Sequence, residues 1–382
     1  MRLIYIANAR IPTEKAHGLQ IMKMCEAFAE ESTEVELVLP TRRDPKFNSV
    51  EPFKYYGVEK NFDINKIKTV DPWWLIWGPK GIYIKVQLIL FSLKVRTYLS
   101  KKKIEADDIL YTRDEYLLPV LQSVASSTRV IWEAHNLPRN KARYLNYWKK
   151  CHKIIAITTG LKNELVALGL DQGKILVAPD GVDLKIFSAA SDPDKVKAEY
   201  GLPADHKLVM YVGHLYEWKG AQVLADAAGH LPANVSVVFV GGTPTDFSRF
   251  KEQNNSKSNI HFIKHQPPSK IPGILSAADV LVLPNSGRSK IGSTFTSPMK
   301  LFEYMAVKKP IVASNLESIK EILSDKNAVL VKADDSKSLL MGIEKVIKDK
   351  NLSDNISEQA YRDVQDYTWQ KRAKSIFSSL LK

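Results

Sequence analysis

Two short stretches pair a glycine with a basic side chain where a strand would pass into a helix. His17 and Gly18 come before a helical pattern in the first half, and Lys219 and Gly220 come before another in the second half. Backbone N–H groups at the start of a helix favour an anion, and a lysine beside them could clamp a diphosphate. Each pair could equally be a turn glycine next to a solvated side chain, so both interpretations stay open.

A run of small polar residues supplies a third candidate. Within residues 292–314, Thr296 and Ser297 directly precede Pro298, a residue favoured in the first turn of a helix. Their backbone N–H groups could face a ligand. Glu303 follows on the same predicted helix. A buried glutamate there would need a polar partner such as a ribose diol, whereas an exposed one would be an ordinary surface residue.

A single histidine, His135, follows a predicted strand of the first half. Its imidazole could hydrogen-bond a sugar hydroxyl, although a lone histidine is more often structural. Asp192 and Asp194 have the spacing of a metal-binding carboxylate pair, but they lie in a polar linker and are expected to be solvated. No His/Cys cluster has zinc spacing, so no metal site and no cofactor are predicted.

The elements that would hold these residues follow a βαβ rhythm. Apolar strand candidates occupy residues 3–8, 35–40, 108–112, 129–134, 153–158 and 175–179, and then 207–213, 235–242, 259–264, 279–284, 310–314 and 327–331. Amphipathic helical patterns separate several of them, and one more is expected from Ser357 to Leu381. The alternation predicts an α/β fold of two tandem Rossmann-like domains with parallel sheets, joined near residues 183–206. Ligands would bind at the carboxyl ends of the strands.

Composition excludes several classes of protein. The 382 residues are 45% hydrophobic and 25% charged, which is typical of a globular chain and not of a disordered, collagenous or coiled-coil one. The net charge of +13 is spread over both halves and suits nucleic acid, anionic membrane or phosphorylated ligands. Two cysteines, no signal-peptide pattern and no long apolar run predict a cytoplasmic protein that does not span a membrane.

The segment from Pro72 to Ile104 contains no acidic residue. Trp73, Trp74 and Trp77 open it, and lysines follow among apolar residues at helical spacing. Such a segment could seat on the anionic inner face of the cell membrane and favour a lipid-linked acceptor. It could also be an ordinary domain helix with a basic solvated face.

Four stretches, taken in order, resemble the retaining family 4 glycosyltransferases of the GT-B architecture. They are GVDLKIF (181–187), VGHLYEWKG (212–220), AADVLVLPN (277–285) and SPMKLFEYMAVKKPIVAS (297–314). The first half is similar more loosely, through residues 15–29 and Glu133-x-His135. The resemblance implies two Rossmann-like domains facing a cleft. An acceptor domain would cover residues 1–183, a nucleotide-sugar donor domain residues 184–360, and a helix over 361–382 would pack back on the first domain.

The resemblance also implies roles for particular residues. Lys219 would bind the diphosphate, Glu303 the ribose, and His135 would lie near the donor sugar, which makes His135 and Lys219 the expected catalytic pair. The donor-binding set would be Gly18, Gly213, His214, Lys219, Lys264, Thr296, Ser297, Pro298, Lys300, Leu301 and Glu303. Arg113 and the three tryptophans are assigned to the acceptor or the membrane. No metal is required, because basic side chains and helix dipoles neutralise the leaving diphosphate.

Two positions depart from the family pattern. His214 stands where the family has arginine, a loss for which Lys290 or Lys300 could compensate, and Phe295 stands where it has the first of two glutamates. We therefore expect a retaining transferase that moves a sugar from a nucleotide-diphosphate sugar to a glycan or lipid-linked acceptor of the cell envelope. A nucleotide-sugar 2-epimerase and a non-catalytic nucleotide-sugar-binding protein are the alternatives. Nucleic-acid binding is disfavoured, because no basic recognition helix is present.

Overall fold

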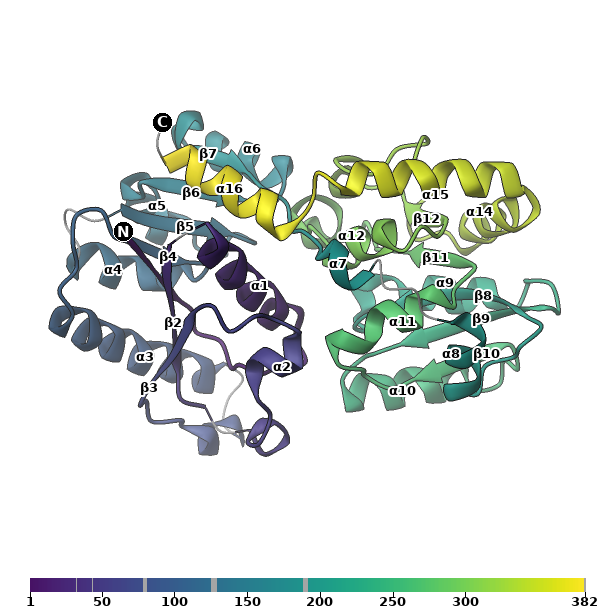
Figure 1. The fold of residues 1–382 in the computed structure, drawn as a ribbon, viewed down its shortest axis with the longest axis horizontal. Helices are drawn as coiled ribbons and strands as arrows, with labels where there is room; N and C mark the ends of the chain where they lie inside the picture. The colour runs from purple at the N-terminus through teal and green to yellow at the C-terminus, as the bar shows by residue number, and fades with distance from the viewer. Residues whose placement is uncertain (32, 43, 78–80, 125–128, 188–191, 381–382) are drawn as a thin grey trace. The chain divides into compact units, whose positions relative to one another are not determined.

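The computed structural model describes the chain apart from residues 32, 43, 78–80, 125–128, 188–191 and 381–382. It divides into two compact units. The first unit comprises Met1–Ala178 and Trp369–Lys382, and the second comprises Pro179–Thr368. Each unit has its own parallel sheet flanked by helices (Figure 1).

The first unit is built on a seven-stranded parallel sheet of order β3-β2-β1-β4-β5-β6-β7. Its strands are β1 (Arg2–Ile6), β2 (Glu34–Pro40), β3 (Asp63–Ile67), β4 (Ile109–Thr112), β5 (Arg129–Ala134), β6 (Lys153–Ala156) and β7 (Ile175–Val177). Its helices are α1 (Ala16–Glu30), α2 (Pro52–Tyr56), α3 (Ile82–Lys101), α4 (Leu118–Val124), α5 (Ala142–Lys150), α6 (Thr159–Ala167) and α16 (Trp369–Leu380). The sequence pattern predicted all of these strands except β3, a largely exposed edge strand without an apolar run.

The second unit has a six-stranded parallel sheet of order β10-β9-β8-β11-β12-β13. The strands are β8 (Lys207–Val212), β9 (Val235–Val240), β10 (Ile260–Ile263), β11 (Val280–Leu283), β12 (Ile311–Ser314) and β13 (Val329–Val331). The helices are α7 (Leu184–Phe187), α8 (Pro193–Glu199), α9 (Ala221–Ala228), α10 (Pro244–Asn254), α11 (Ile271–Ser276), α12 (Met299–Ala306), α13 (Glu317–Lys320), α14 (Ser336–Lys348) and α15 (Lys350–Val364). Successive residues of β8 enter two different hydrophobic cores, which is why its sequence is apolar throughout.

The helix predicted from Ser357 to Leu381 is two elements. Helix α15 ends at Val364 in the second unit, and α16 begins at Trp369 in the first. Between them, the carbonyl of Tyr367 accepts a hydrogen bond from the Val182 N–H, and Thr368 forms a parallel bridge with Val182. This pairing takes the chain out of helical conformation. Helix α16 then packs on α1, where the rings of Phe28 and Phe377 meet edge to face at 5.2 Å.

The order of strands reverses at one point in each sheet. The chain runs outward from β1 to β3 and returns at β4, and it runs outward from β8 to β10 and returns at β11. In open parallel sheets the loops diverge at such a point and leave room for a ligand beyond the carboxyl ends of the strands. The sequence-predicted residues fall largely at these two places.

Candidate functional site

The loop after β8 in the second unit is held by two glycines in left-handed conformation. Gly213 has φ 144° and Gly220 has φ 71°. A Cβ added to Gly220 would lie 1.7 Å from the carbonyl oxygen of Pro284, just past β11. The Ser286 N–H also donates to the Trp218 carbonyl at 3.0 Å. The loop is therefore fixed against the end of β11, where the sheet order reverses.

Two lysines lie at this loop: Lys219 belongs to it, and Lys300 reaches its start at Gly213. Lys300 extends from α12, is only 9% exposed, and its Nζ lies 4.0 Å from the centre of the Tyr211 ring. Burial, and next the charge of Lys219, lower the pKa of Lys300 well below its usual value. Burial also lowers the pKa of Lys219 to about 8. Within the described residues the Lys300 Nζ has no hydrogen-bond partner, and the charge of Glu303 only partly offsets the lowering of its pKa, so an anionic ligand would satisfy this group.

Glu303 lies one turn further along α12. Burial raises its pKa to about 7, an effect that the positive charge of Lys300 partly offsets. The carboxyl group is therefore close to half-protonated at neutral pH. It can accept hydrogen bonds from a diol in one form and donate one in the other.

Asn285 is a site residue that the sequence analysis did not single out. It directly follows β11 and is 0% exposed, and neither its Nδ2 nor its Oδ1 has a hydrogen-bond partner in the described part of the chain. Buried amides are nearly always bonded, so an orphaned one beside the Lys219 loop points to a bound molecule. The only sequence signal was its place at the end of AADVLVLPN.

Other predicted donor-binding groups already have partners within the protein. The His214 ring stacks on Tyr216 at 4.9 Å, and the His214 carbonyl accepts from the Tyr211 hydroxyl at 2.5 Å. The Ser297 hydroxyl accepts from the Asp180 N–H at 3.0 Å. The Leu301 side chain belongs to the hydrophobic core, and its N–H donates to the Pro298 carbonyl at 2.8 Å.

The second unit also contains the predicted donor-binding residues Pro298, Thr296, Lys264 and Gly213. Helix α12 begins at Met299, one residue later than predicted, because Pro298 has the extended backbone of a cap. Thr296 is partly exposed just before it, and Lys264 is exposed after β10, the edge strand. Gly213 is close to Lys300, whose Cδ would lie 3.9 Å from a Cβ added there.

The first unit contains a buried polar network centred on Glu133, at the end of β5. Glu133 is 0% exposed and accepts hydrogen bonds from the Gln20 Nε2 at 2.7 Å and from the Tyr111 hydroxyl. It bonds the His135 Nε2 at 2.5 Å and pairs with Arg372 of α16 at 3.2 Å. Burial alone would raise the pKa of Glu133, but Arg372 and His135 hold it well below its usual value.

Two more predicted residues join this region. The Arg113 guanidinium donates to the Gln20 Oε1 at 2.8 Å, which brings Arg113 into the same network as His135. His17 lies close to both, and its pKa is lowered to about 3 by burial and next by the charge of Arg113. His17 is therefore neutral at physiological pH.

Gly18 has a packing reason to be glycine. It lies in the first turn of α1, and an added Cβ would be 2.3 Å from the Tyr56 hydroxyl. That hydroxyl accepts from the Thr13 N–H at 2.7 Å and donates to the Thr13 carbonyl at 2.9 Å. The contact fixes how the helix begins after β1. A phosphate contact at Gly18 stays a prediction.

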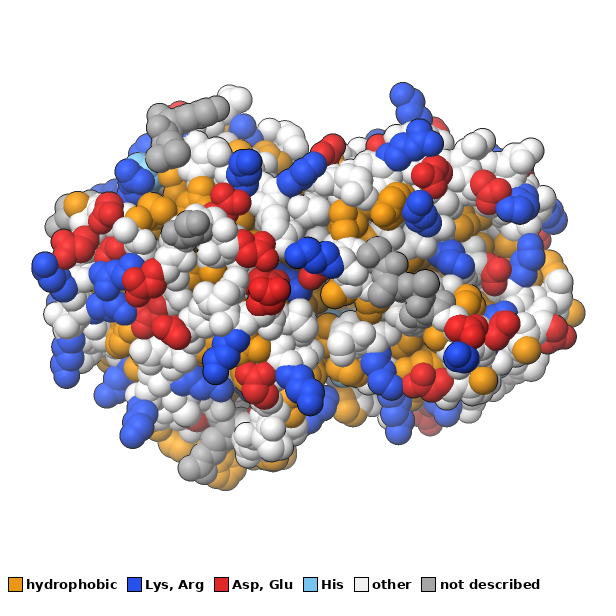
Figure 2. Space-filling model, viewed as in Figure 1, with side chains coloured by type: hydrophobic (Ala, Val, Ile, Leu, Met, Phe, Trp, Pro, Cys, Tyr) orange, Lys and Arg blue, Asp and Glu red, His pale blue; other side chains and the backbone are white. Residues whose placement is uncertain are grey.

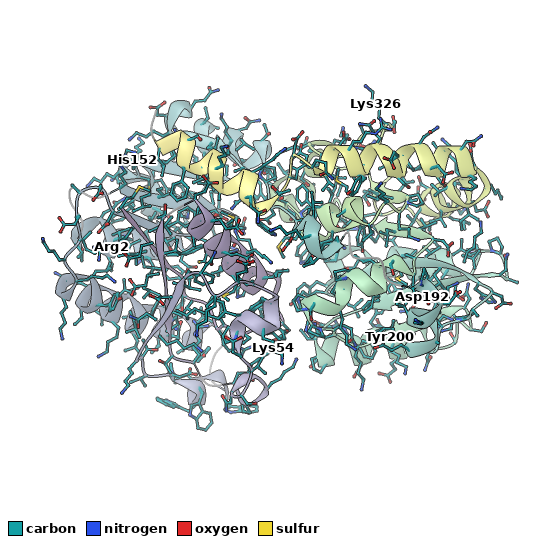
Figure 3. The ribbon with its side chains drawn as sticks, viewed as in Figure 1. Arg2, Lys54, His152, Asp192, Tyr200 and Lys326 are labelled. Atoms are coloured by element: carbon teal, nitrogen blue, oxygen red, sulfur yellow. The ribbon has the colours of Figure 1, made fainter. Side chains whose placement is uncertain are left out.

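The three tryptophans lie apart from this network in the chain, on the short 3₁₀ helix η2 (Trp73–Trp77). Trp73, Trp74 and Trp77 are 55%, 53% and 87% exposed. Among the described residues, no group of three His, Cys, Asp or Glu side chains could hold a metal ion. Asp192 serves instead as the N-cap of α8, accepting from the Asp194 N–H at 3.1 Å (Figure 3).

Residues 192–363 match the family described as glycosyl transferases group 1. The sequence is similar to D-inositol 3-phosphate glycosyltransferase of Corynebacterium glutamicum, with 23% identity over 54% of this chain and 51% of that protein. It is also similar to the uncharacterized glycosyltransferase MJ1069 of Methanocaldococcus jannaschii, with 25% identity over 59% of this chain and 57% of that protein. The chain thus spans about half the length of the curated relatives it matches.

Solved structures share the fold over the whole chain. Sucrose-phosphate synthase of Thermosynechococcus elongatus has a TM-score of 0.78 at 18% identity, covering 99% of this chain and 98% of that one. Anabaena HepE in complex with UDP-glucose has a TM-score of 0.76 at 17% identity, covering 100% and 99%. The expected GT-B fold is confirmed, and the family 4 assignment stays a prediction. Residues 192–363 therefore match the group 1 glycosyltransferases, and the whole chain shares the GT-B fold of two α/β units with parallel sheets.

Proposed function

We propose that this protein is a retaining glycosyltransferase that moves a sugar from a nucleoside diphosphate sugar to a glycan or lipid-linked acceptor. The observation that carries the proposal is that Lys219 and Lys300 both lie at the loop after β8, where the second sheet reverses its order. Burial and the nearby positive charge disfavour the charged form of Lys300, and a bound anion would favour it again. A diphosphate supplies that anion.

The proposed donor site uses the groups around the two lysines. Lys219 and Lys300 bind the diphosphate, and Glu303 accepts hydrogen bonds from the ribose hydroxyls. The side-chain amide of Asn285 forms hydrogen bonds with the donor. The backbone of residues 296–298 faces the phosphates. HepE, which shares this fold, has been solved with UDP-glucose, and this supports a nucleotide sugar as the ligand class.

The proposed reaction breaks the bond between the sugar's anomeric carbon and the diphosphate oxygen. A bond from that carbon to the acceptor oxygen forms on the same face, and the acceptor's proton passes to the departing phosphate. The lysines stabilise the negative charge that grows on the diphosphate, so neither a metal nor a cofactor is needed. His135, oriented by Glu133, would contact the donor sugar. Gly18 would adjoin the phosphates, and Arg113 would contact the acceptor.

The proposed setting is the cytoplasm, in synthesis of cell-envelope polysaccharide or glycoconjugate. Cys25 and Cys151 are both free and buried, which fits a reducing compartment. No helix in the described residues is long and apolar enough to cross a membrane.

A thermal-shift panel of UDP, GDP, ADP and their sugars tests the donor site. A ligand at about 100 times its Kd adds roughly 2.7 kcal/mol to the free energy of unfolding. We expect one nucleotide to stabilise the wild type and the control Lys337→Ala, but not Lys219→Ala. If no nucleotide stabilises the folded wild type, the proposed site is wrong.

Turnover separates the transferase from its alternatives. Incubating the identified donor with and without candidate acceptors, and recording product anomers by NMR, should give an acceptor-dependent product of retained configuration. Reaction of the donor alone to its 2-epimer would indicate an epimerase. Tight binding without any reaction would indicate a nucleotide-sugar-binding protein.

A further inference from the structure

The exposed large hydrophobic side chains of this protein are concentrated in one segment. Of the ten such side chains in the described residues, eight lie between Val70 and Leu93. Hydrophobic side chains lie together at the lower edge of the first unit (Figure 2). Scattered exposed apolar residues are ordinary, but a contiguous patch marks a surface that meets something else.

Helix α3 has apolar residues also on its solvent-facing side, where the side chains of a surface helix are usually polar. Its inward side holds Phe91, Val95 and Leu99, all at most 1% exposed. On the opposite side Ile82, Ile89 and Leu93 are 39%, 60% and 57% exposed. Their spacing of seven and four residues places these three on one helical stripe. The sequence predicted this stripe, but only the structure shows that it faces away from the domain core.

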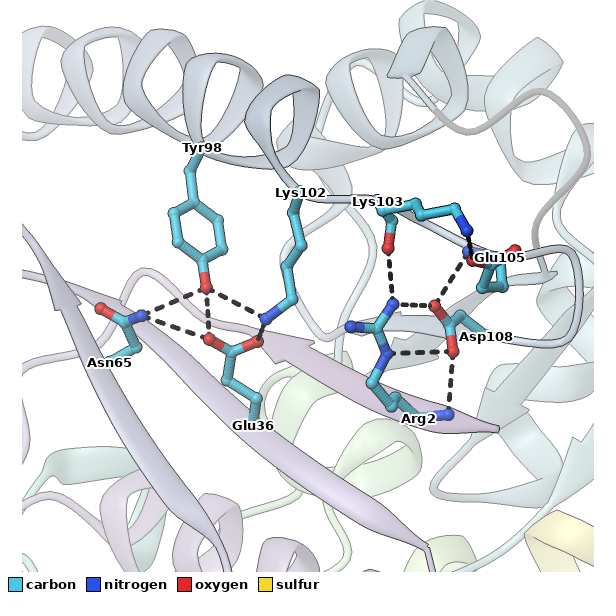
Figure 4. A network of polar contacts seen from close by, with 8 residues as sticks. All are labelled: Arg2, Glu36, Asn65, Tyr98, Lys102, Lys103, Glu105 and Asp108. Atoms are coloured by element: carbon cyan, nitrogen blue, oxygen red, sulfur yellow. Dashed lines mark hydrogen bonds and ion pairs between the residues drawn. The ribbon is translucent and has the colours of Figure 1, made fainter.

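The inward side of α3 is anchored firmly to the sheet. Tyr98 and Lys102 both bond the Glu36 carboxylate of β2, and Figure 4 shows all three pointing toward one another. At the other end, the Tyr83 hydroxyl donates to Asp71 at 2.9 Å, which ties the start of α3 to the chain just before η2. The helix therefore cannot simply roll over to bury its apolar stripe.

Basic residues accompany the stripe without acidic neighbours. Lys85 and Arg96 are exposed on the same side of α3, and neither forms an ion pair with the part of the chain that the structure describes. No acidic residue occurs between Pro72 and Ile104. If two copies met symmetrically through this surface, like charges would be brought together, whereas an anionic surface would complement them.

We propose that η2 and the outward side of α3 dock the first unit onto an anionic lipid bilayer. Trp73, Trp74 and Trp77 lie at the headgroup level, where tryptophan is favoured, and Ile82, Ile89 and Leu93 enter the boundary of the acyl chains. Lys85 and Arg96 contact the anionic headgroups. The docking does not depend on the proposed glycosyl transfer, and it is measured without any sugar substrate.

Cosedimentation of the full chain with vesicles tests the proposal. Vesicles of phosphatidylglycerol with phosphatidylcholine are compared with phosphatidylcholine alone, each at low and high salt. The apolar variant is Trp74→Ser with Trp77→Ser, and its control is Met341→Ser on α14, whose methionine is 71% exposed. The charge variant is Lys85→Gln with Arg96→Gln, and its control is Lys337→Gln with Lys345→Gln, two exposed lysines of α14.

We expect the wild type and both controls to bind phosphatidylglycerol vesicles in a salt-sensitive way. Each basic residue removed near the bilayer should weaken binding about fivefold, so the charge variant should lose roughly 25-fold. The apolar variant should lose binding even at low salt. Because all substituted side chains are exposed, melting temperatures should stay unchanged, which separates loss of docking from loss of folding.

Three results would overturn the proposal. The first is absence of binding to phosphatidylglycerol vesicles, and the second is equal binding by the variants and their controls. The third is a change of oligomeric state, measured by light scattering without lipid: the wild type is a dimer, and the variant Trp74→Ser with Trp77→Ser is a monomer. That result would assign the surface to contact between copies of this chain.

Discussion

Arg372 and Glu133 form a buried ion pair at 3.2 Å across 239 positions of the sequence. Arg372 is 5% exposed and also donates to the Ala178 carbonyl at 3.2 Å, so both ends of its guanidinium are bonded. The last helix is thus tied to the residue that bonds His135. The pair couples the position of α16 to the orientation of the proposed catalytic histidine.

Removing Arg372 should strongly destabilise the first unit. Arg372→Gln leaves the Glu133 charge buried without its main partner, which costs about 3–5 kcal/mol. Arg372→Gln with Glu133→Gln should recover much of that loss. Urea unfolding of the single and double variants measures both, and equal stabilities would contradict the pairing.

The same pair gives stability a defined pH dependence. The pKa of Glu133 is depressed in the folded state, so its contribution is present above its unfolded value of 4.5 and is lost as the pH falls through the lower folded pKa. In Arg372→Gln this depression is relieved. The stability gap between the wild type and Arg372→Gln should therefore narrow as the pH falls below about 4.5, as measured by urea unfolding across that range.

Binding of UDP, if UDP is the donor nucleotide, should weaken at alkaline pH. Lys219 has a pKa of about 8 in the unliganded protein, so its charge is lost above that pH. Affinity measured by calorimetry should fall by up to tenfold per pH unit above 8. Lys219→Arg, which stays charged, should show a flatter profile. A wild-type affinity that does not change up to pH 10 would argue against this contact.

Lys300→Met should affect stability and binding in opposite directions. Methionine removes a buried amino group that has no hydrogen-bond partner in the described residues, so the unliganded protein should gain about 1–3 kcal/mol. Nucleotide affinity should fall, because one diphosphate contact is lost. The depressed pKa also makes the wild type more stable as the pH rises toward 10.5, and the variant should lose this slope. Thermal unfolding with and without nucleotide, repeated across this pH range, measures the stability gain, the loss of affinity and the loss of the pH slope.

Asn285→Leu should leave the unliganded protein as stable as the wild type or more so. Neither polar atom of Asn285 has a partner in the described residues, so apolar replacement removes an unsatisfied group. Asn254 is the matched control, because it is equally buried but bonds Gln222 and the Phe250 carbonyl. Asn254→Leu should lose about 1–3 kcal/mol. Only Asn285→Leu should weaken nucleotide binding, and a large loss of stability in that variant would contradict its assignment.

Gly220→Ala should disrupt the lysine loop. Its Cβ would lie 1.7 Å from the Pro284 carbonyl oxygen, at a backbone φ of 71°. Gly229→Ala is the control, because nothing lies within 4 Å of its added Cβ and its φ is −63°. Alanine there should be neutral or should stabilise by about 0.4–1 kcal/mol. Melting temperatures and nucleotide binding of the two variants test the difference.

The sequence alone determined the α/β class and twelve of the thirteen strands found in the described residues, because a strand of a buried parallel sheet must be apolar along its whole length. It also indicated the group 1 family, since the motifs around Lys219 and Glu303 occur in order along one stretch of chain. These signals are local. The strand β3 was not predicted, because this exposed edge strand has no run of apolar residues.

Tertiary structure decided which distant groups meet. Lys300 reaches the loop that carries Lys219, and Arg372 meets Glu133, only because separate loops and helices converge in the folded units. Asn285 became a candidate only once its burial without a partner was known. The periodicity of α3 is the same whether its stripe faces the core or the solvent, and the packing of Phe91 and Val95 made that choice. The spacing of apolar residues predicts which side of a helix they share, whereas packing decides whether that side contacts the core or the solvent.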